Sequence, residues 1–266
     1  MQNQNRAKPL CLLLIDGLHP DLLLREEFGG IRKYIDQFPF TVLKSGDKNI
    51  DTPWNAYMEL GAGSNNFDFA YKINYSIPMT LSSMGLSQLY VSDTENYANT
   101  TFFFNGKNKE QNELVQKIEI NSCEKDNYEE YYEIIIKKIN SCIIRSTENR
   151  DHDFILANYP IIDEKFKGDK DFLKTIDTNF KKLADIILAY NGCIILSAST
   201  SLMRGNNIVP FLIISKSLEN KSFADYDNSI SIEKQIPKYW IYDIAPTILK
   251  IMGLNKPKQM IGNPLL

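Results

Sequence analysis

The fold is decided by the stretch LCLLLIDG, which runs from Leu10 to Gly17. Six apolar residues in a row, closed by an aspartate and a glycine, are typical of a strand buried on both faces of a parallel sheet. Such a strand delivers the next residue to the carboxyl edge of the sheet, where α/β proteins place their ligand sites. The stretch therefore predicts a central strand with Asp16 at a functional edge.

Segments typical of strands and helices alternate along the rest of the chain. The further strand candidates are Phe38–Leu43, Gln88–Val91, Thr100–Phe104, Asp153–Ala157, Cys193–Leu196 and Pro210–Ile214. The helix candidates, chosen by apolar residues at three- and four-residue spacing, are Tyr128–Ile139, Asp171–Tyr190 and Tyr239–Met252, the last stopped by Gly253. The alternation predicts an α/β fold with a doubly wound, mostly parallel sheet and helices on both faces.

The composition narrows the class of protein. The chain has 266 residues, of which 43% are hydrophobic and 24% are charged, as is ordinary for a globular protein. Its net charge of −3 does not indicate a basic surface that would bind nucleic acid. Its longest apolar run is too short for direct membrane insertion. The opening Met1–Lys8 is basic without an apolar core, unlike a secretory signal. The four cysteines show no CxxC pairing, so we expect an intracellular protein, cytoplasmic or organellar, mitochondria included.

Several motifs resemble one known family. The run from Leu89 to Gly106, which contains Phe-Phe-Phe-Asn-Gly, resembles a signature of the cofactor-independent (2,3-bisphosphoglycerate-independent) phosphoglycerate mutases, in the alkaline phosphatase superfamily. Five more segments resemble the family in the same order: Leu12–Gly17, Phe154–Asp163, Gly192–Ala198, Val209–Ile213 and Asp243–Leu254. The resemblance implies an alkaline-phosphatase-like fold and a site built for two metal ions.

One part of the family pattern is missing. The family inserts a second, transferase domain soon after its nucleophile, whereas only about twenty residues, roughly Asn65 to Ser83, separate the matching motifs here. That length is too short for a domain. We therefore expect residues 1–266 to form a single alkaline-phosphatase-like domain, with the inserted domain absent near residues 65–83.

The resemblance also identifies the positions at which the chain departs from the family. Asp16 and Asp163 match two metal ligands, but the remaining ligand positions fall on Lys167, Ser199, Thr200 and Arg204. The nucleophile motif falls near Gly63 or Ser64, its register being open, and the substrate-binding lysine becomes Asn96. These residues are interpreted as vestigial metal-site, nucleophile and substrate positions.

The substitutions carry a chemical meaning. A protonated lysine or arginine cannot coordinate a cation, and each repels one. Lys167 or Arg204 paired with Asp163 would replace the charge that a metal supplied there. The plainer interpretations are that Lys167 and Arg204 are solvated surface residues and that Asp16 only closes a turn.

The remaining candidate residues are interpreted as structural. Ser64 is interpreted first as a loop or capping residue, since nothing nearby activates it. His19 and His152 are predicted to be surface histidines. The aromatic run Phe102–Phe104 is predicted to be core, with alternate side chains on the two faces of a sheet.

These observations predict a catalytically inactive member of the family, a structural or accessory subunit whose partners are other proteins of unknown identity. We expect no cofactor and no bound metal. Two alternatives stay open at this point. One is a residual phosphatase or phosphomutase that uses Asp16, Asp163 and Ser64 with one metal. The other is a sensor of small anions that uses the new positive charge of the pocket.

Overall fold

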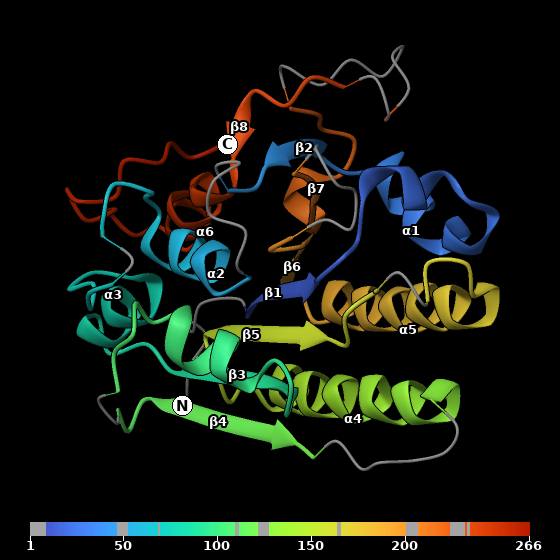
Figure 1. The fold of residues 1–266 in the computed structure, drawn as a ribbon, viewed down its shortest axis with the longest axis horizontal. Helices are drawn as coiled ribbons and strands as arrows, with labels where there is room; N and C mark the ends of the chain where they lie inside the picture. The colour runs from blue at the N-terminus through green and yellow to red at the C-terminus, as the bar shows by residue number, and fades with distance from the viewer. Residues whose placement is uncertain are drawn as a thin grey trace.

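The computed structural model contains one eight-stranded sheet, in the order β4-β3-β5-β1-β6-β7-β2-β8 (Figure 1). The structure describes residues 9–46, 53–68, 70–109, 112–121, 128–163, 166–200, 207–223, 232 and 235–266. The strands are β1 (Leu10–Ile15), β2 (Phe40–Lys44), β3 (Gln88–Asp93), β4 (Val115–Ile120), β5 (Phe154–Tyr159), β6 (Cys193–Ser197), β7 (Ile208–Ile214) and β8 (Tyr239–Trp240). Every pairing is parallel except the two made by β7. The predicted α/β fold with a mostly parallel sheet is confirmed.

The first strand lies at the centre of this sheet, as its sequence predicts. β1 pairs with β5 on one side and β6 on the other, and all six of its residues are buried. Cys11 and Cys193 are buried core residues, also as predicted. Burial raises the pKa of both thiols, to about 12 for Cys193, so neither is a ready nucleophile.

The helices form two groups, which Figure 1 shows on either side of the central strands. They are α1 (Gly29–Ile35), α2 (Pro53–Ala62), α3 (Ile77–Ser83), α4 (Tyr128–Asn149), α5 (Lys170–Ala189) and α6 (Ile244–Ile251), with short 3₁₀ turns η1 (Pro20–Leu24), η2 (Glu26–Phe28), η4 (Lys216–Leu218) and η6 (Ile241–Asp243). In one group α5 packs against both α1 and α4; in the other, α2 packs against α3 and α6. No helix in the described part of the chain is long and apolar enough to cross a membrane.

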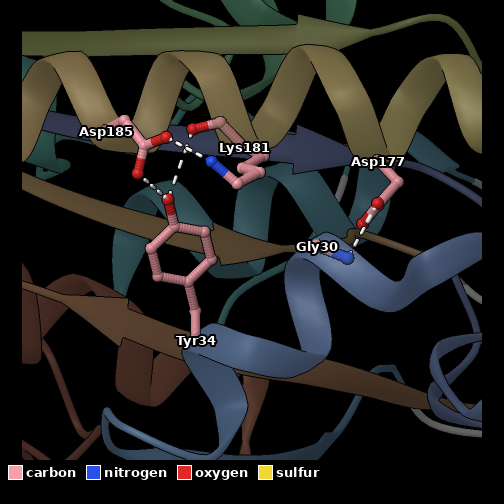
Figure 2. Close-up of polar contacts among 5 residues, drawn as sticks. All are labelled: Gly30, Tyr34, Asp177, Lys181 and Asp185. Carbon is pink, nitrogen blue, oxygen red and sulfur yellow. Dashed lines mark hydrogen bonds and ion pairs between the residues drawn. The ribbon is translucent and has the colours of Figure 1, made fainter.

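Figure 2 shows how α5 holds α1 in place. The carboxylate of Asp177 accepts hydrogen bonds from the backbone amides of Gly30 and Ile31, at 2.8 and 2.7 Å. These amides lie in the first turn of α1, where no intrahelical acceptor exists, so Asp177 satisfies them and complements the helix dipole. One turn further along α1, the hydroxyl of Tyr34 donates to Asp185, which also accepts from Lys181 at 2.6 Å.

The aromatic run was predicted wrongly as a strand. Asn99–Phe103 forms a π-helical turn, η3, in which the Phe104 amide donates to the Asn99 carbonyl at 3.0 Å. Aromatic and threonine side chains favour strands locally, but here helix α2 packs directly on the turn. A Cβ atom on Gly61 of α2 would lie only 1.9 Å from the Phe104 carbonyl oxygen. Only Phe104 is fully buried, so the run does not alternate between two sheet faces.

Three smaller expectations also need correction. Tyr239–Met252 is not one helix, because Asp243 accepts a hydrogen bond from the Trp240 amide and α6 begins only after it. Gly253 does end α6, with a positive φ of 74°. α4 extends ten residues past the predicted end, to Asn149, and β4 was not anticipated.

Candidate functional site

The carboxyl ends of four adjacent parallel strands, in the order β3-β5-β1-β6, bring polar residues to one edge of the sheet. The buried polar residues at or just beyond these ends include Asp93, Asn96, Asn158, Asp16, His19 and Ser199. The backbone ties two of the connecting loops together, because the Ile162 amide donates to the Asp16 carbonyl at 2.8 Å. The edge that the first stretch predicted therefore exists, with Asp16 at its centre.

The carboxylate of Asp16 is surrounded by hydrogen-bond donors of the protein itself. Its Oδ1 atom accepts from the backbone amide of Ser199 at 2.8 Å and from the Ser199 hydroxyl at 2.6 Å. Its Oδ2 atom accepts from the hydroxyl of Tyr57 at 2.6 Å and from Nδ2 of Asn158 at 3.1 Å. An ionised carboxylate offers about four lone-pair directions, so these donors use its full accepting capacity.

Tyr57 links helix α2 to this cluster. Its side chain is fully buried, and its hydroxyl also accepts a hydrogen bond from Nδ2 of Asn158. Burial raises the pKa of Tyr57 well above its usual value, and the charge of Asp16 raises it further. The hydroxyl therefore stays protonated and acts as a donor to Asp16. We call Asp16, Tyr57, Asn158 and Ser199 the Asp16 cluster.

The second acid at this edge, Asp93, is buried at the end of β3. Its Oδ1 atom accepts from the backbone amide of Asn96 at 3.0 Å and from the side-chain amide of Asn96 at 2.9 Å. Burial raises the pKa of Asp93, the two hydrogen bonds from Asn96 lower it, and the charges of Glu95 and Asp16 raise it. Asn96 therefore holds Asp93 by neutral hydrogen bonds at a position where the resemblance expects a lysine.

The loop after β5 carries Asp163 and Lys167. The Asp163 carboxylate accepts from the backbone amide of Phe166 at 3.1 Å, and the Lys167 amide donates to the Asp163 carbonyl at 3.1 Å. Among the ion pairs between described residues, none joins the Asp163 carboxylate to the Lys167 ammonium. Arg204 lies outside the described residues, so the pairing of Asp163 with Lys167 or Arg204 stays a prediction.

His19 is not a surface residue, contrary to the prediction, and only 7% of it is exposed. It precedes η1, where Nδ1 accepts from the Asp21 amide at 3.2 Å, while Nε2 has no hydrogen-bond partner among the described residues. Burial lowers the pKa of His19, Asp21 raises it, and the nearby charge of Lys167 lowers it again. His152 is half-buried and contacts the Ser146 hydroxyl.

Ser64 follows the C-terminal end of α2, two residues after Ala62. It is fully buried, and its Oγ atom accepts from the Asn66 amide at 3.1 Å. The preceding Gly63 ends α2 with a φ of 61°, and its carbonyl accepts from the Gly262 amide at 3.0 Å. The C-terminal segment thus covers the end of α2. The hydroxyl from this region that contacts Asp16 is that of Tyr57 in α2, not that of Ser64.

This donor set does not fit a pair of metal ions. Around Asp16 stand a backbone N–H and a side-chain amide N–H, which cannot coordinate a cation, and two hydroxyls that already donate to the carboxylate. Hard divalent cations need several carboxylate or imidazole ligands. Across the ranges that the structure describes, no group of three or more His, Cys, Asp or Glu side chains could hold a metal ion.

Comparison with known proteins identifies the superfamily to which the chain belongs. A family model described as "Metalloenzyme superfamily" matches residues 46–256, and the chain belongs to this superfamily. It is similar to the 2,3-bisphosphoglycerate-independent phosphoglycerate mutase of Clostridium kluyveri, with 29% identity over 205 residues that cover 70% of this chain and 38% of the relative. The mutase of Clostridium beijerinckii is 23% identical over 264 residues, which cover 91% of this chain and 46% of that protein. The resemblance read from the motifs is confirmed.

Solved structures agree with this fold. Leishmania mexicana phosphoglycerate mutase matches 72% of this chain and 39% of its own, with a TM-score of 0.54 and 17% identity. The lipoteichoic acid synthase LtaP from Listeria monocytogenes matches 98% of this chain and 76% of its own, with a TM-score of 0.66 and 9% identity. The chain spans less than half the length of the curated mutases above. The fold is thus alkaline-phosphatase-like.

Proposed function

We propose that this chain is a catalytically inactive, phosphoglycerate-mutase-like protein that acts as a structural or accessory subunit in a protein assembly. The observation that carries the proposal is the Asp16 cluster. Asp16 sits at a metal-ligand position of the family, yet four donors from three residues of this chain converge on it. A cation at this place would meet hydrogen atoms instead of lone pairs.

Two further features support the proposal that the chain does not catalyse metal-dependent phosphoryl transfer. Metal-dependent phosphoryl transfer needs a nucleophile, a phosphoryl group and cations at close range. Here Ser64, the hydroxyl residue at the expected nucleophile motif, is fully buried, and the C-terminal segment binds the neighbouring Gly63. In addition, Lys167 occupies a ligand position with a charge that repels a divalent ion.

A role in protein contacts is supported by two exposed aromatic side chains. Between α2 and α3 the described residues 63–68 and 70–76 form a loop. Trp54 of α2 stacks on Phe103, with ring centroids 6.0 Å apart. Trp54 is 44% exposed, and Tyr71 in the loop is 70% exposed. Exposed aromatic side chains are enriched at protein interfaces, since each offers a large contact area at small entropic cost. We infer that Trp54 and Tyr71 belong to the partner surface.

The loss of chemistry is tested by measuring metal content and phosphatase turnover of the purified protein. We expect no stoichiometric manganese, zinc or magnesium, no thermal stabilisation by these ions, and no turnover above background. A metal bound in the wild-type protein and lost in Asp16→Ala, or turnover lost in Ser64→Ala, would establish the residual-phosphatase alternative.

The partner role is tested by the size of the native complex in gentle extracts. A Trp54→Glu variant should release the chain from its assembly, whereas Tyr190→Glu, a change at another exposed aromatic residue, should not. If the native protein is free of partners, the accessory-subunit proposal fails. Stabilisation of such a protein by inorganic phosphate, abolished in Lys167→Ala, would then favour the anion-sensor alternative.

A further inference from the structure

The edge strand β4 presents a hydrogen-bonding edge that nothing in the described structure pairs with. β4 is the terminal strand of the sheet and pairs only with β3, in parallel, along residues Val115–Ile120. Figure 1 shows it at the border of the molecule. Its outward backbone N–H and C=O groups form a template for another strand. Two of its side chains, Lys117 and Glu119, are exposed, and within the described ranges neither forms an ion pair.

The sequence of β4 is self-complementary in charge. Lys117 and Glu119 are two residues apart, so they project from the same face of the strand, with Ile118 between them on the other face. When two copies of β4 run antiparallel about a twofold axis through Ile118, Lys117 of each copy lies directly opposite Glu119 of the other. Ile118 of one copy then lies opposite Ile118 of the other. Within each copy, Ile118 packs against apolar side chains of the core.

Other registers lack this match. An axis through Lys117 would place two lysines opposite each other, and an axis through Glu119 would place two glutamates opposite each other. Like charges directly opposite destabilise an antiparallel pair, and opposite charges stabilise it. A twofold axis that passes between two adjacent residues would place Lys117 or Glu119 of one copy opposite Ile118 of the other. Such a register pairs side chains that belong to opposite faces of the sheet. The charge pattern therefore specifies one register.

We infer that this chain forms a homodimer through antiparallel pairing of β4 with β4 of a second copy, centred on Ile118. The contact joins two eight-stranded sheets into one continuous sheet. It is isologous, so both copies use the same surface and the assembly closes as a dimer. The pairing depends on neither metal nor catalysis, and it stands whether or not the Asp16 cluster is active.

Sedimentation equilibrium of purified wild-type protein and charge variants tests the inference. The wild type should be in monomer–dimer equilibrium. Lys117→Glu and Glu119→Lys should each weaken the dimer by roughly 10- to 100-fold, because each turns both symmetry-related attractive pairs into repulsive ones. The double variant Lys117→Glu/Glu119→Lys restores opposite charges across the axis, so it should recover most of the wild-type affinity. Lys182→Glu, an exposed charge reversal on α5, should leave the affinity unchanged.

Three results would overturn the inference. The first is a wild-type protein that stays monomeric at the highest concentration reached. The second is a dimer that neither single charge reversal weakens. The third is a dimer that the single variants lose and the double variant does not regain. Thermal unfolding of each variant serves as the check on folding, since these side chains are exposed and their replacement should not unfold the monomer.

Discussion

Removing the hydroxyl of Tyr57 should weaken the fold through Asp16. In the Tyr57→Phe variant, Asp16 loses a donor at 2.6 Å inside a fully buried site, while the ring and its packing remain. A hydrogen bond to a charged group contributes about 1.5–3 kcal/mol to stability. Since 1 kcal/mol shifts the melting temperature of a chain near this size by about 2–4 °C, we expect a decrease of about 3–12 °C.

The assay is urea unfolding of four proteins: wild type, Tyr57→Phe, Asp16→Asn and the double variant. If the hydroxyl acts through the charge of Asp16, its removal should cost less in the Asp16→Asn background, where it faces a neutral amide. Residues in direct contact couple by about 0.5–3 kcal/mol, so we expect a coupling energy of at least about 1 kcal/mol.

Equal costs of Tyr57→Phe in both backgrounds would refute this reasoning. They would mean that the hydroxyl contributes nothing specific to the carboxylate. The Asp16 cluster would then give no support to an inactive site. A second refuting result would be a Tyr57→Phe variant as stable as wild type, because the hydroxyl would then contribute nothing to the stability of the fold.

Two further predictions test the packing and the charges elsewhere. Gly61→Ala should destabilise the fold by about 1–3 kcal/mol or more in urea unfolding, because the new Cβ atom would lie 1.9 Å from the backbone carbonyl oxygen of Phe104 and no rotamer can relieve the clash. The control is Gly29→Ala, which should leave the stability unchanged, because nothing lies within 4 Å of the new Cβ atom. Equal effects of the two substitutions would contradict the close approach of α2 to Phe104. Asp185→Asn should lower stability near neutral pH, with the loss shrinking as the pH falls. Burial raises the pKa of Asp185, but hydrogen bonds from Lys181 and a tyrosine hydroxyl outweigh it, so the folded pKa lies below the usual value and the ionised form contributes stability above it. A stability difference that stays constant across acidic pH would contradict this assignment.

The parts of the fold that could be predicted are those in which local sequence and tertiary position agree. The apolar run Leu10–Ile15 has no polar side chain to place, so it fits only a strand covered on both faces. Thr100–Phe104 shows the opposite case, since its residues favour a strand while the packing of α2 on Phe104 imposes a π-turn. β4 was missed because Gln116, Lys117 and Glu119 interrupt its apolar residues, as expected of an exposed edge.

The site was predictable only where a residue follows a strand. Asp16 was found because it follows the first strand, and Asn158 could have been found in the same way, since it lies at the end of β5. Tyr57 carries no such signal, because its contact with Asp16 depends on the tertiary position of α2 and not on a preceding strand. His19 was placed on the surface by residue type alone, whereas its ring accepts from the Asp21 amide at the start of η1. Whether Lys167, Thr200 and Arg204 act as vestigial ligand positions stays a prediction.

The central place of β1 has a consequence for synthesis of the chain on the ribosome. Leu10 pairs with Phe154 in β5 and with Cys193 in β6, so β1 is flanked by two strands that are synthesised well after it. Until both have emerged, six consecutive apolar residues have no sheet to enter, and exposed segments of this kind are prone to aggregate. Helix α1 is also unstable until α5 has been made, because its first turn depends on Asp177 of α5 and seven residues are too few for a stable isolated helix. These segments therefore cannot fold one by one in the order of their synthesis, because β1 and α1 both depend on β5, α5 and β6, which are made more than a hundred residues later.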